Sequence, residues 1–250
     1  MNNELTQFYK KNNIYDVPLH LSCHHRKTCW SGLDEEKPKE NNASIYLPYI
    51  GERYSEAKIL VIGINMNNYG GTNAAKYLIS RVKEELPTGK KKLFGNKNYK
   101  GTMFFYQFAK YVNILCHSKF KDTQENLGET LEFIAYTNHI KCSPDDRKKE
   151  KTKGVSKPSQ EMWNNCGEHI LKREIEILKP DYILVLGKSK NFSKLKEIFT
   201  VKRIKLNSNH IQKYDILHNN KIIECFVFPH PGVPKGINKQ LFTDFKNIVK

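Results

Sequence analysis

Three loops of the sequence carry amide or imidazole side chains directly after a short apolar run. Residues 58–63 (KILVIG) lead into INMNNYGG, residues 133–138 (FIAYTN) into HIKCSP, and residues 222–228 (IIECFVF) into PHPG. The candidate functional side chains are Asn65, Asn138 and His230. An amide offers both a hydrogen-bond donor and an acceptor, and a neutral imidazole can donate to an oxygen that gains negative charge.

Each of these side chains also has a simpler interpretation. Asn65 can form a left-handed turn, Asn138 can cap its own loop, and His230 can bond to a nearby carbonyl. The choice between the two interpretations depends on whether the fold brings the three residues together.

The apolar runs that precede the loops predict the scaffold. Together with residues 181–187 (DYILVLG), they have the length and composition of buried parallel strands. Helical patterns separate them at residues 73–86, 102–117, 159–178 and 190–199, and a last one closes the chain at 239–249. This alternation predicts an α/β fold with a three-layer α/β/α architecture around a central four-stranded parallel sheet, with right-handed crossovers.

Ligands of an open α/β sheet bind beyond the carboxyl ends of its strands. Because three of the four expected strands end in the polar loops, we expect Asn65, Asn138 and His230 to lie at one edge of the sheet. The sequence shows no internal repeat or linker, so we expect residues 1–250 to form one domain. Within it we expect an irregular N-terminal segment at 1–50 and a basic insertion loop at 145–157 (DDRKKEKTKGVSK).

The charge of the chain favours a polyanionic partner. Lysine and arginine number 42 against 26 acidic residues, which gives a formal net charge of +16. No acidic residue occurs between positions 86 and 121, where lysines alternate with aromatic residues. Such a stretch is typical of a nucleic-acid surface, although a lysine-rich composition can also serve only solubility. We predict nucleic-acid contacts for Lys90, Lys91, Lys92 and Lys100.

The sequence also limits where the protein works. No apolar run approaches the length of a transmembrane helix, and the N-terminus has no signal-peptide core. We therefore expect a soluble, cytoplasmic monomer that binds double- or single-stranded DNA and no membrane. In a reducing compartment the six cysteines are not expected to form a disulfide framework, and Cys116 and Cys225 lie in apolar stretches typical of a core.

Four segments of the chain resemble motifs of the uracil-DNA glycosylase superfamily. Residues 63–67 (GINMN) resemble its first motif, which reads GINPG in the mismatch-specific branch and GEAPG in the iron–sulfur branch. Residues 137–144 (TNHIKCSP) resemble N-V-V-K-C-R-P, and residues 159–166 followed by LKPDYILVLG resemble T-P-E-E…C…L-x-P…ivlLG, both of the iron–sulfur branch. Residues 228–232 (FPHPG) resemble the terminal HPS motif.

The resemblance spans residues 57–234 and implies a DNA glycosylase, which flips a base out of DNA and hydrolyses its N-glycosidic bond. In this interpretation Asn138 reads the base edge, His230 stabilises the departing base, and Asn65 orients the attacking water. The first motif departs from the family pattern, because Met66 and Asn67 replace its proline and glycine. This departure concerns specificity for uracil more than the fold.

The resemblance also implies the walls of a base pocket. Tyr99 is expected to stack on the base, since residues 99–101 (YKG) resemble the Phe-x-Gly of the iron–sulfur branch. Phe105 or Phe104 can replace it, although both are also typical core residues. Met66 is expected to contact the base, and Val233 is expected to act as a wedge in the minor groove.

The iron–sulfur branch holds a [4Fe–4S] cluster with four cysteines, and the resemblance places these ligands at Cys23, Cys29, Cys142 and Cys166. Thiolates in this number suit an iron–sulfur cluster or zinc. The first two are spaced C-x5-C, whereas the family usually has C-x2-C. The alternatives are zinc, with His24 or His25 replacing one cysteine, and four unligated thiols.

The sequence leaves the excised base undecided. Uracil or another deaminated base would indicate repair, whereas a bulky hypermodified base would indicate an antiviral enzyme that attacks phage DNA. A third hypothesis is a catalytically inactive DNA-binding member of the superfamily. A Rossmann-type nucleotide enzyme fits poorly, because no G-x-G-x-x-G follows the first strand.

Overall fold

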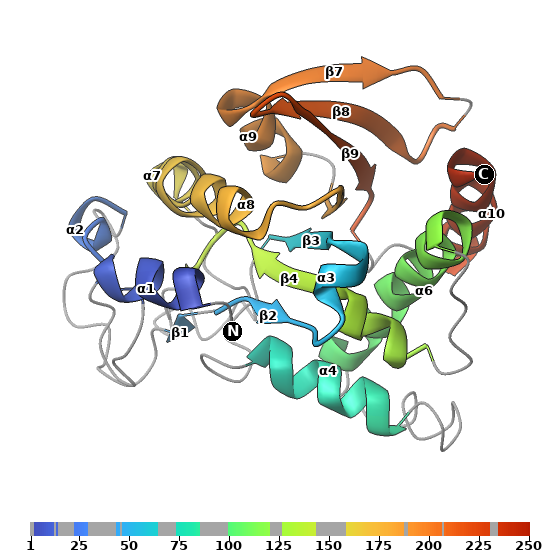
Figure 1. The fold of residues 1–250 in the computed structure, drawn as a ribbon, viewed down its shortest axis with the longest axis horizontal. Helices are drawn as coiled ribbons and strands as arrows, with labels where there is room; N and C mark the ends of the chain where they lie inside the picture. The colour runs from blue at the N-terminus through green and yellow to red at the C-terminus, as the bar shows by residue number, and fades with distance from the viewer. Residues whose placement is uncertain are drawn as a thin grey trace, which may run out of the picture.

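The computed structural model describes residues 3–12, 14, 23–29, 44–45, 47–64, 74–85, 100–120, 127–143, 159–187, 190–206, 208–230 and 235–250. A mixed sheet of seven strands forms the centre of this part of the chain, in the order β2-β4-β3-β6-β9-β8-β7 (Figure 1). The strands are β2 (Tyr49–Ile50), β3 (Ile59–Gly63), β4 (Ile134–Asn138), β6 (Tyr182–Leu186), β7 (Thr200–Ile204), β8 (Gln212–His218) and β9 (Lys221–Phe228).

The four central strands, β4, β3, β6 and β9, are parallel to one another. They coincide with the four apolar runs of the sequence, so the prediction of an α/β fold around a four-stranded parallel sheet is confirmed. Every residue of β3 and β4 is buried. Burial on both faces explains why these strands consist of continuous rather than alternating apolar residues.

Three further strands widen the sheet and were not predicted. β2 pairs antiparallel with β4, β8 with β9, and β7 with β8. The β8–β9 turn contains Asn219 and Asn220, whose φ angles of 47° and 59° are those of a tight hairpin turn with both central residues left-handed. β7 is the edge strand and is largely exposed, so it has no apolar run by which the sequence would identify it.

Helices cover both faces of the sheet and complete the predicted three layers (Figure 1). One face and its helices form the first core cluster, and the other face and its helices form the second. The helices of the first are α1 (Asn3–Lys11), α2 (Arg26–Cys29), α7 (Gln160–Asn165), a π-helical turn (Cys166–Leu171), α8 (Lys172–Leu178) and α9 (Lys190–Ile198); those of the second are α4 (Ala74–Glu85), α6 (Lys100–Phe120) and α10 (Lys235–Val249).

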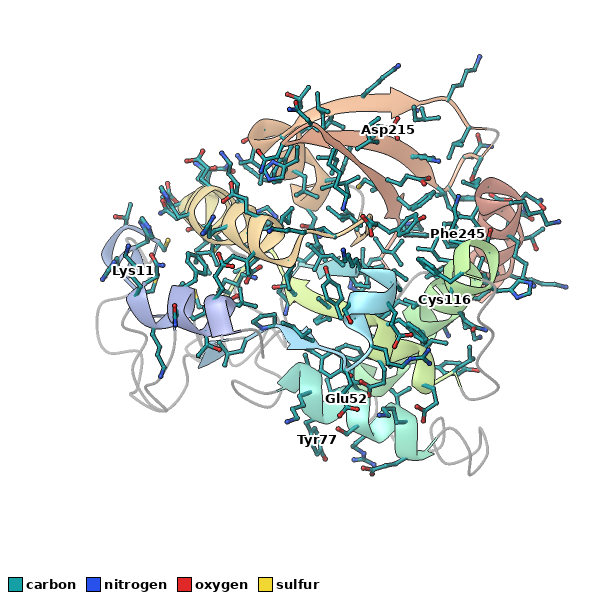
Figure 2. All side chains as sticks on the ribbon, viewed as in Figure 1. Lys11, Glu52, Tyr77, Cys116, Asp215 and Phe245 are labelled. Atoms are coloured by element: carbon teal, nitrogen blue, oxygen red, sulfur yellow. The ribbon has the colours of Figure 1, made fainter. Side chains whose placement is uncertain are left out.

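Side chains fill the space between these layers (Figure 2). Cys116 of α6 and Phe245 of α10 lie on one side of the molecule, away from Lys11 at the end of α1. Cys116 and Cys225 are buried in the core, as their apolar surroundings in the sequence indicated. Two short elements, α3 (Tyr54–Ala57) and a 3-10 helix (Glu129–Phe133), lead into β3 and β4.

The N-terminal segment is more regular than expected. α1 buries Leu5 and Tyr9 in the first core cluster, and its polar residues face outward, so it is an amphipathic helix. A two-stranded ladder of β1 (Ser44–Ile45) and β5 (Cys142–Ser143) lies apart from the main sheet. The expected basic loop at 145–157 lies outside the described residues. None of the described helices combines the length and apolarity that a membrane span requires.

Candidate functional site

The pairing of β3 with β4 continues past the last residue of each strand and begins the site. Gly63 lies opposite Asn138 in the ladder. The amide of His139 then donates to the carbonyl of Gly63, and the amide of Ile140 donates to that of Ile64, each at 2.9 Å. The loop that follows Ile64 therefore starts beside Asn138. Asn65 and Met66 lie in that loop, outside the described residues.

A buried amide side chain of α9 stabilises this edge of the sheet by hydrogen bonds. Asn191 is fully buried, and its Nδ2 donates to the carbonyls of Ile62, Gly63 and Leu186 at 3.2–3.4 Å. Its Oδ1 lies 3.1 Å from Nδ1 of His139. Burial lowers the pKa of His139 to about 4, so the ring is neutral near pH 7. One side chain thus links the ends of β3 and β6 with the loop after β4.

Asn138 is buried at the end of β4, where the sequence predicted a base-reading amide. Its side chain is 2% exposed, and its Oδ1 accepts a hydrogen bond of 2.9 Å from the hydroxyl of Tyr136. Gly63 makes room for this pair: a Cβ at position 63 would lie 2.4 Å from the Tyr136 hydroxyl and 2.6 Å from Oδ1 of Asn138. Contacts with protein groups rather than with water therefore determine the position of the amide.

Phe104 lies near two parts of the predicted site: β4, which carries Asn138, and His230. Its ring centroid is 6.3 Å from that of Tyr136 and 5.7 Å from that of His230. Phe104 itself is only partly buried. The His230 side chain stays exposed, but partial loss of water around the imidazole lowers its pKa, which keeps the ring neutral near pH 7. The ring of Phe104 thus contacts both Tyr136, the hydrogen-bond partner of Asn138 on β4, and the imidazole that follows β9.

None of the remaining predicted contact residues has a described side chain that faces an open pocket. Phe105 is 0% exposed and lies in the second core cluster, against Phe108 and Tyr136, so its ring faces the interior rather than an open pocket. The other predicted contacts, Tyr99, Val233, Lys90, Lys91 and Lys92, lie outside the described residues. Lys100 is the first residue of α6, but its side chain is not described.

Two lysines of the basic stretch take part in the fold. The ammonium of Lys110 lies 4.5 Å from the ring centroid of Tyr106 and 5.0 Å from that of Phe242. Lys119 lies 3.9 Å from a carboxylate oxygen of Glu224. These contacts join α6 to α10 and to β9, so part of the positive charge of this stretch is structural.

All four cysteines predicted as metal ligands lie in one region, on the opposite face of the sheet from Phe104. Cys29, Cys142 and Cys166 belong to the first core cluster, and Cys23 packs against it. α2 is tied to α7 because Ser159 donates to the carbonyl of Cys29 at 2.9 Å and Asn165 donates to its sulfur at 3.3 Å.

The thiols differ from exposed cysteines in their acidity. Burial raises the pKa of Cys166 to about 12 and also raises the pKa of Cys23 and Cys29. Among the residues that the structure describes, no three His, Cys, Asp or Glu side chains converge closely enough to hold a metal ion. The ring of His25 stacks on His169 with centroids 4.6 Å apart, close to the same cysteines in sequence.

A buried ion pair bonds to β4, the strand that carries Asn138. Nζ of Lys141 lies 2.6 Å from Oε2 of Glu174, and the two side chains are 2% and 0% exposed. Both also bond to the hydroxyl of Thr137 on β4. Burial lowers the pKa of Lys141 to about 7 and raises that of Glu174 well above its usual range. No local sequence pattern indicates this pair, because charged residues are rarely fully buried.

Chemically, the edge of the sheet offers a fixed amide, an exposed neutral imidazole and a partly exposed aromatic ring. These groups suit a planar, polar ligand that must be recognised along one edge and stabilised as it gains negative charge. The comparison with protein families agrees with this interpretation, because the model described as Uracil DNA glycosylase superfamily matches residues 52–240. No curated protein matches the chain.

We expect Asn191→Ala to destabilise the fold, because it removes the buried side-chain donor to carbonyls of β3 and β6. The free energy of unfolding, measured by urea titration, should fall by about 1–3 kcal/mol. Asn164→Ala is the matched control: Asn164 is an exposed residue of α7, and its removal should change the free energy by less than about 0.5 kcal/mol. Equal effects of the two substitutions would contradict the stabilising role of the Asn191 hydrogen bonds.

Proposed function

Because the chain belongs to the uracil DNA glycosylase superfamily, we propose that it is a DNA glycosylase that flips a uracil or modified base out of DNA and hydrolyses its N-glycosidic bond. The observation that carries this proposal is the position of Phe104, whose ring contacts both His230 and Tyr136, the hydrogen-bond partner of Asn138. Three chain segments that are distant in sequence thereby contribute to one potential base site.

In the proposed reaction, Asn138 recognises the polar edge of the extruded base. As the bond between the sugar C1′ and the base nitrogen breaks, the electron pair moves to the base. His230, neutral because its pKa is lowered, donates a hydrogen bond to the base oxygen that becomes negative. A water molecule oriented by Asn65 adds to C1′, and the protons are exchanged with solvent. The products are the free base and an abasic site.

The stacking surface that we propose is Phe104 rather than Phe105. Phe104 is partly exposed and lies beside His230, whereas Phe105 is enclosed by the core. Tyr99 immediately precedes α6 and remains the predicted second stacking residue, and Met66 remains a predicted base contact. An aromatic face holds a base by stacking and by exclusion of water.

We further propose that the enzyme binds DNA as a monomer through Lys90, Lys91, Lys92 and Lys100, and that Val233 fills the gap left by the extruded base. Residues 90–92 lie between α4 and α6, and Val233 follows His230 by three positions. In sequence, both segments therefore adjoin parts of the chain that carry base-site residues, α6 with Phe104 and the end of β9 with His230. Phosphate contacts of this kind give affinity without sequence specificity.

For the four cysteines we propose a structural [4Fe–4S] cluster held by Cys23, Cys29, Cys142 and Cys166. Support comes from their common location in and against the first core cluster and from the donor set of four thiols. The cluster would join α2 and the β1–β5 ladder to the π-helical turn. It supplies no step of the hydrolysis, and zinc is the alternative occupant.

The proposed chemistry is tested with oligonucleotides that carry a single uracil, hypoxanthine or modified cytosine, followed by alkaline cleavage of abasic sites. Asn138→Ala and His230→Ala should each slow excision by at least about tenfold, because each removes one transition-state hydrogen bond, while circular dichroism shows that both variants remain folded at the assay temperature. An absence of abasic product with every substrate would instead support the inactive DNA-binding hypothesis.

The pH dependence of excision provides the control for His230. Its lowered pKa means that the imidazole becomes protonated only below its ordinary value of 6.5, so the activity should persist at pH 7 and decline as the pH falls below about 6.5. His230→Gln should remove this decline. An unchanged acid limb in the glutamine variant would assign the titration to another group.

The cluster is tested on protein purified without air. We expect a brown protein with visible absorbance and roughly four iron atoms per chain. Cys29→Ser, Cys142→Ser and Cys166→Ser should each lose colour and iron. Cys116→Ser is the control, because Cys116 is equally buried but lies on α6, away from α1 (Figure 2). A colourless wild-type protein with stoichiometric zinc would reject iron–sulfur.

The DNA surface is tested by the salt dependence of binding. Replacement of Lys90, Lys91 and Lys92 with alanine should flatten the plot of log affinity against log salt, by about 0.9 for each DNA phosphate that the variant no longer neutralises. A triple alanine variant of the exposed lysines Lys172, Lys202 and Lys246 is the charge-matched control and should retain the wild-type slope. The same slope change in both variants would show that only net charge matters.

A further inference from the structure

The orientation of the Asn138 amide is the feature of the site that determines what it can recognise. A carboxamide has one acceptor edge and one donor edge, and a rotation of 180° about its last bond exchanges them. In Asn138 the oxygen edge is engaged, because Oδ1 accepts the hydrogen bond from the Tyr136 hydroxyl. The Nδ2 edge consequently points away from Tyr136.

Tyr136 is itself fixed in place. It precedes Asn138 by two positions on β4, so both side chains lie on the same face of the sheet. Its ring is 1% exposed, stacks on Phe108 at 5.7 Å with an interplanar angle of 2°, and meets the edge of Phe105 at 4.9 Å. A ring enclosed in this way cannot carry its hydroxyl oxygen away from Asn138 unless the surrounding core residues move.

The phenol of Tyr136 keeps its proton, because burial raises its pKa far above the usual value. A protonated hydroxyl can donate as well as accept, and here it donates to Oδ1 of Asn138. Gly63 supports the arrangement, because any side chain at position 63 would displace both the hydroxyl and Oδ1.

We propose that Tyr136 is a specificity-determining positioning residue, whose hydroxyl fixes the Asn138 amide so that Nδ2 is the donor offered to the base. This inference rests on the proposed function, in which Asn138 reads the base. Bases with a carbonyl oxygen at the recognised edge, such as uracil and hypoxanthine, are accepted. Bases with an amino group there, such as cytosine, are rejected because two donors would face each other.

Without the hydroxyl, the amide can rotate and offer its oxygen to an amino group. Tyr136→Phe removes only the hydroxyl and keeps the ring in its aromatic surroundings. The ratio of excision rates for keto and amino bases, rather than the overall rate, is therefore the quantity that separates a positioning role from a structural one. A structural role would slow excision of every base in the same proportion.

The experiment compares excision rates for matched single-stranded oligonucleotides, in excess enzyme, that carry either a keto base (uracil or hypoxanthine) or an amino base (cytosine or 5-methylcytosine) at one position. We expect wild-type protein to prefer keto bases by at least about a hundredfold. In Tyr136→Phe, this ratio should fall at least about tenfold, which corresponds to the discrimination that one hydrogen bond provides.

Tyr54→Phe is the matched control. Tyr54 is also buried, and its hydroxyl donates to the carbonyl of Leu178 at 3.2 Å, before the start of β3 and away from the base site. This variant should keep the wild-type ratio. A Tyr136→Phe variant with an unchanged ratio, or a wild-type enzyme that prefers amino bases, would overturn the inference. Wild-type protein that excises neither keto base would also overturn the inference, whereas the proposed function itself fails only if no modified base is excised either.

Discussion

The register between β3 and β4 is the constraint on which the site depends. Gly63 and Asn138 lie opposite each other as the last residues of two parallel strands, and the next two amides after β4 continue the bonding to β3. A shift of one residue would move Asn138 to the other face of the sheet, away from Phe104 and His230. Asn191 supports this register, because its side chain donates to carbonyls of both β3 and β6.

The two faces of the sheet carry different candidate functional groups. The face covered by α4, α6 and α10 carries the aromatic cluster, Asn138 and the approach to His230. The face covered by α1, α7, α8 and α9 carries the four cysteines. β4 connects them, because Tyr136 and Asn138 face one side while Thr137 bonds to the Lys141–Glu174 pair on the other. Removal of either partner of this pair would leave the other charge buried and unpaired, which is strongly destabilising.

The sequence predicted those parts of the fold that depend on local composition. Four apolar runs indicated the four central strands, because a strand buried on both faces must be apolar at every position. β7 and β8 were missed because neither contains the continuous apolar run that identified the central strands, although Asn219-Asn220 is a turn signal that would have indicated the β8–β9 hairpin. Tyr136, Asn191, Lys141 and Glu174 were missed for another reason: their roles come from partners distant in sequence, which no local pattern reveals. Phe104 and Phe105 could be separated only by their burial, because both lie on one helix.

The most direct test of the proposed base site is a crystal structure of the protein with an oligonucleotide that contains 2′-fluoro-2′-deoxyuridine, whose glycosidic bond resists hydrolysis. We expect a uracil outside the base stack, with its O4 bonded to Nδ2 of Asn138, its ring beside Phe104 and its O2 facing His230. A uracil that remains stacked in the DNA, or one bound without contact to Asn138 and His230, would contradict the base site described for this fold.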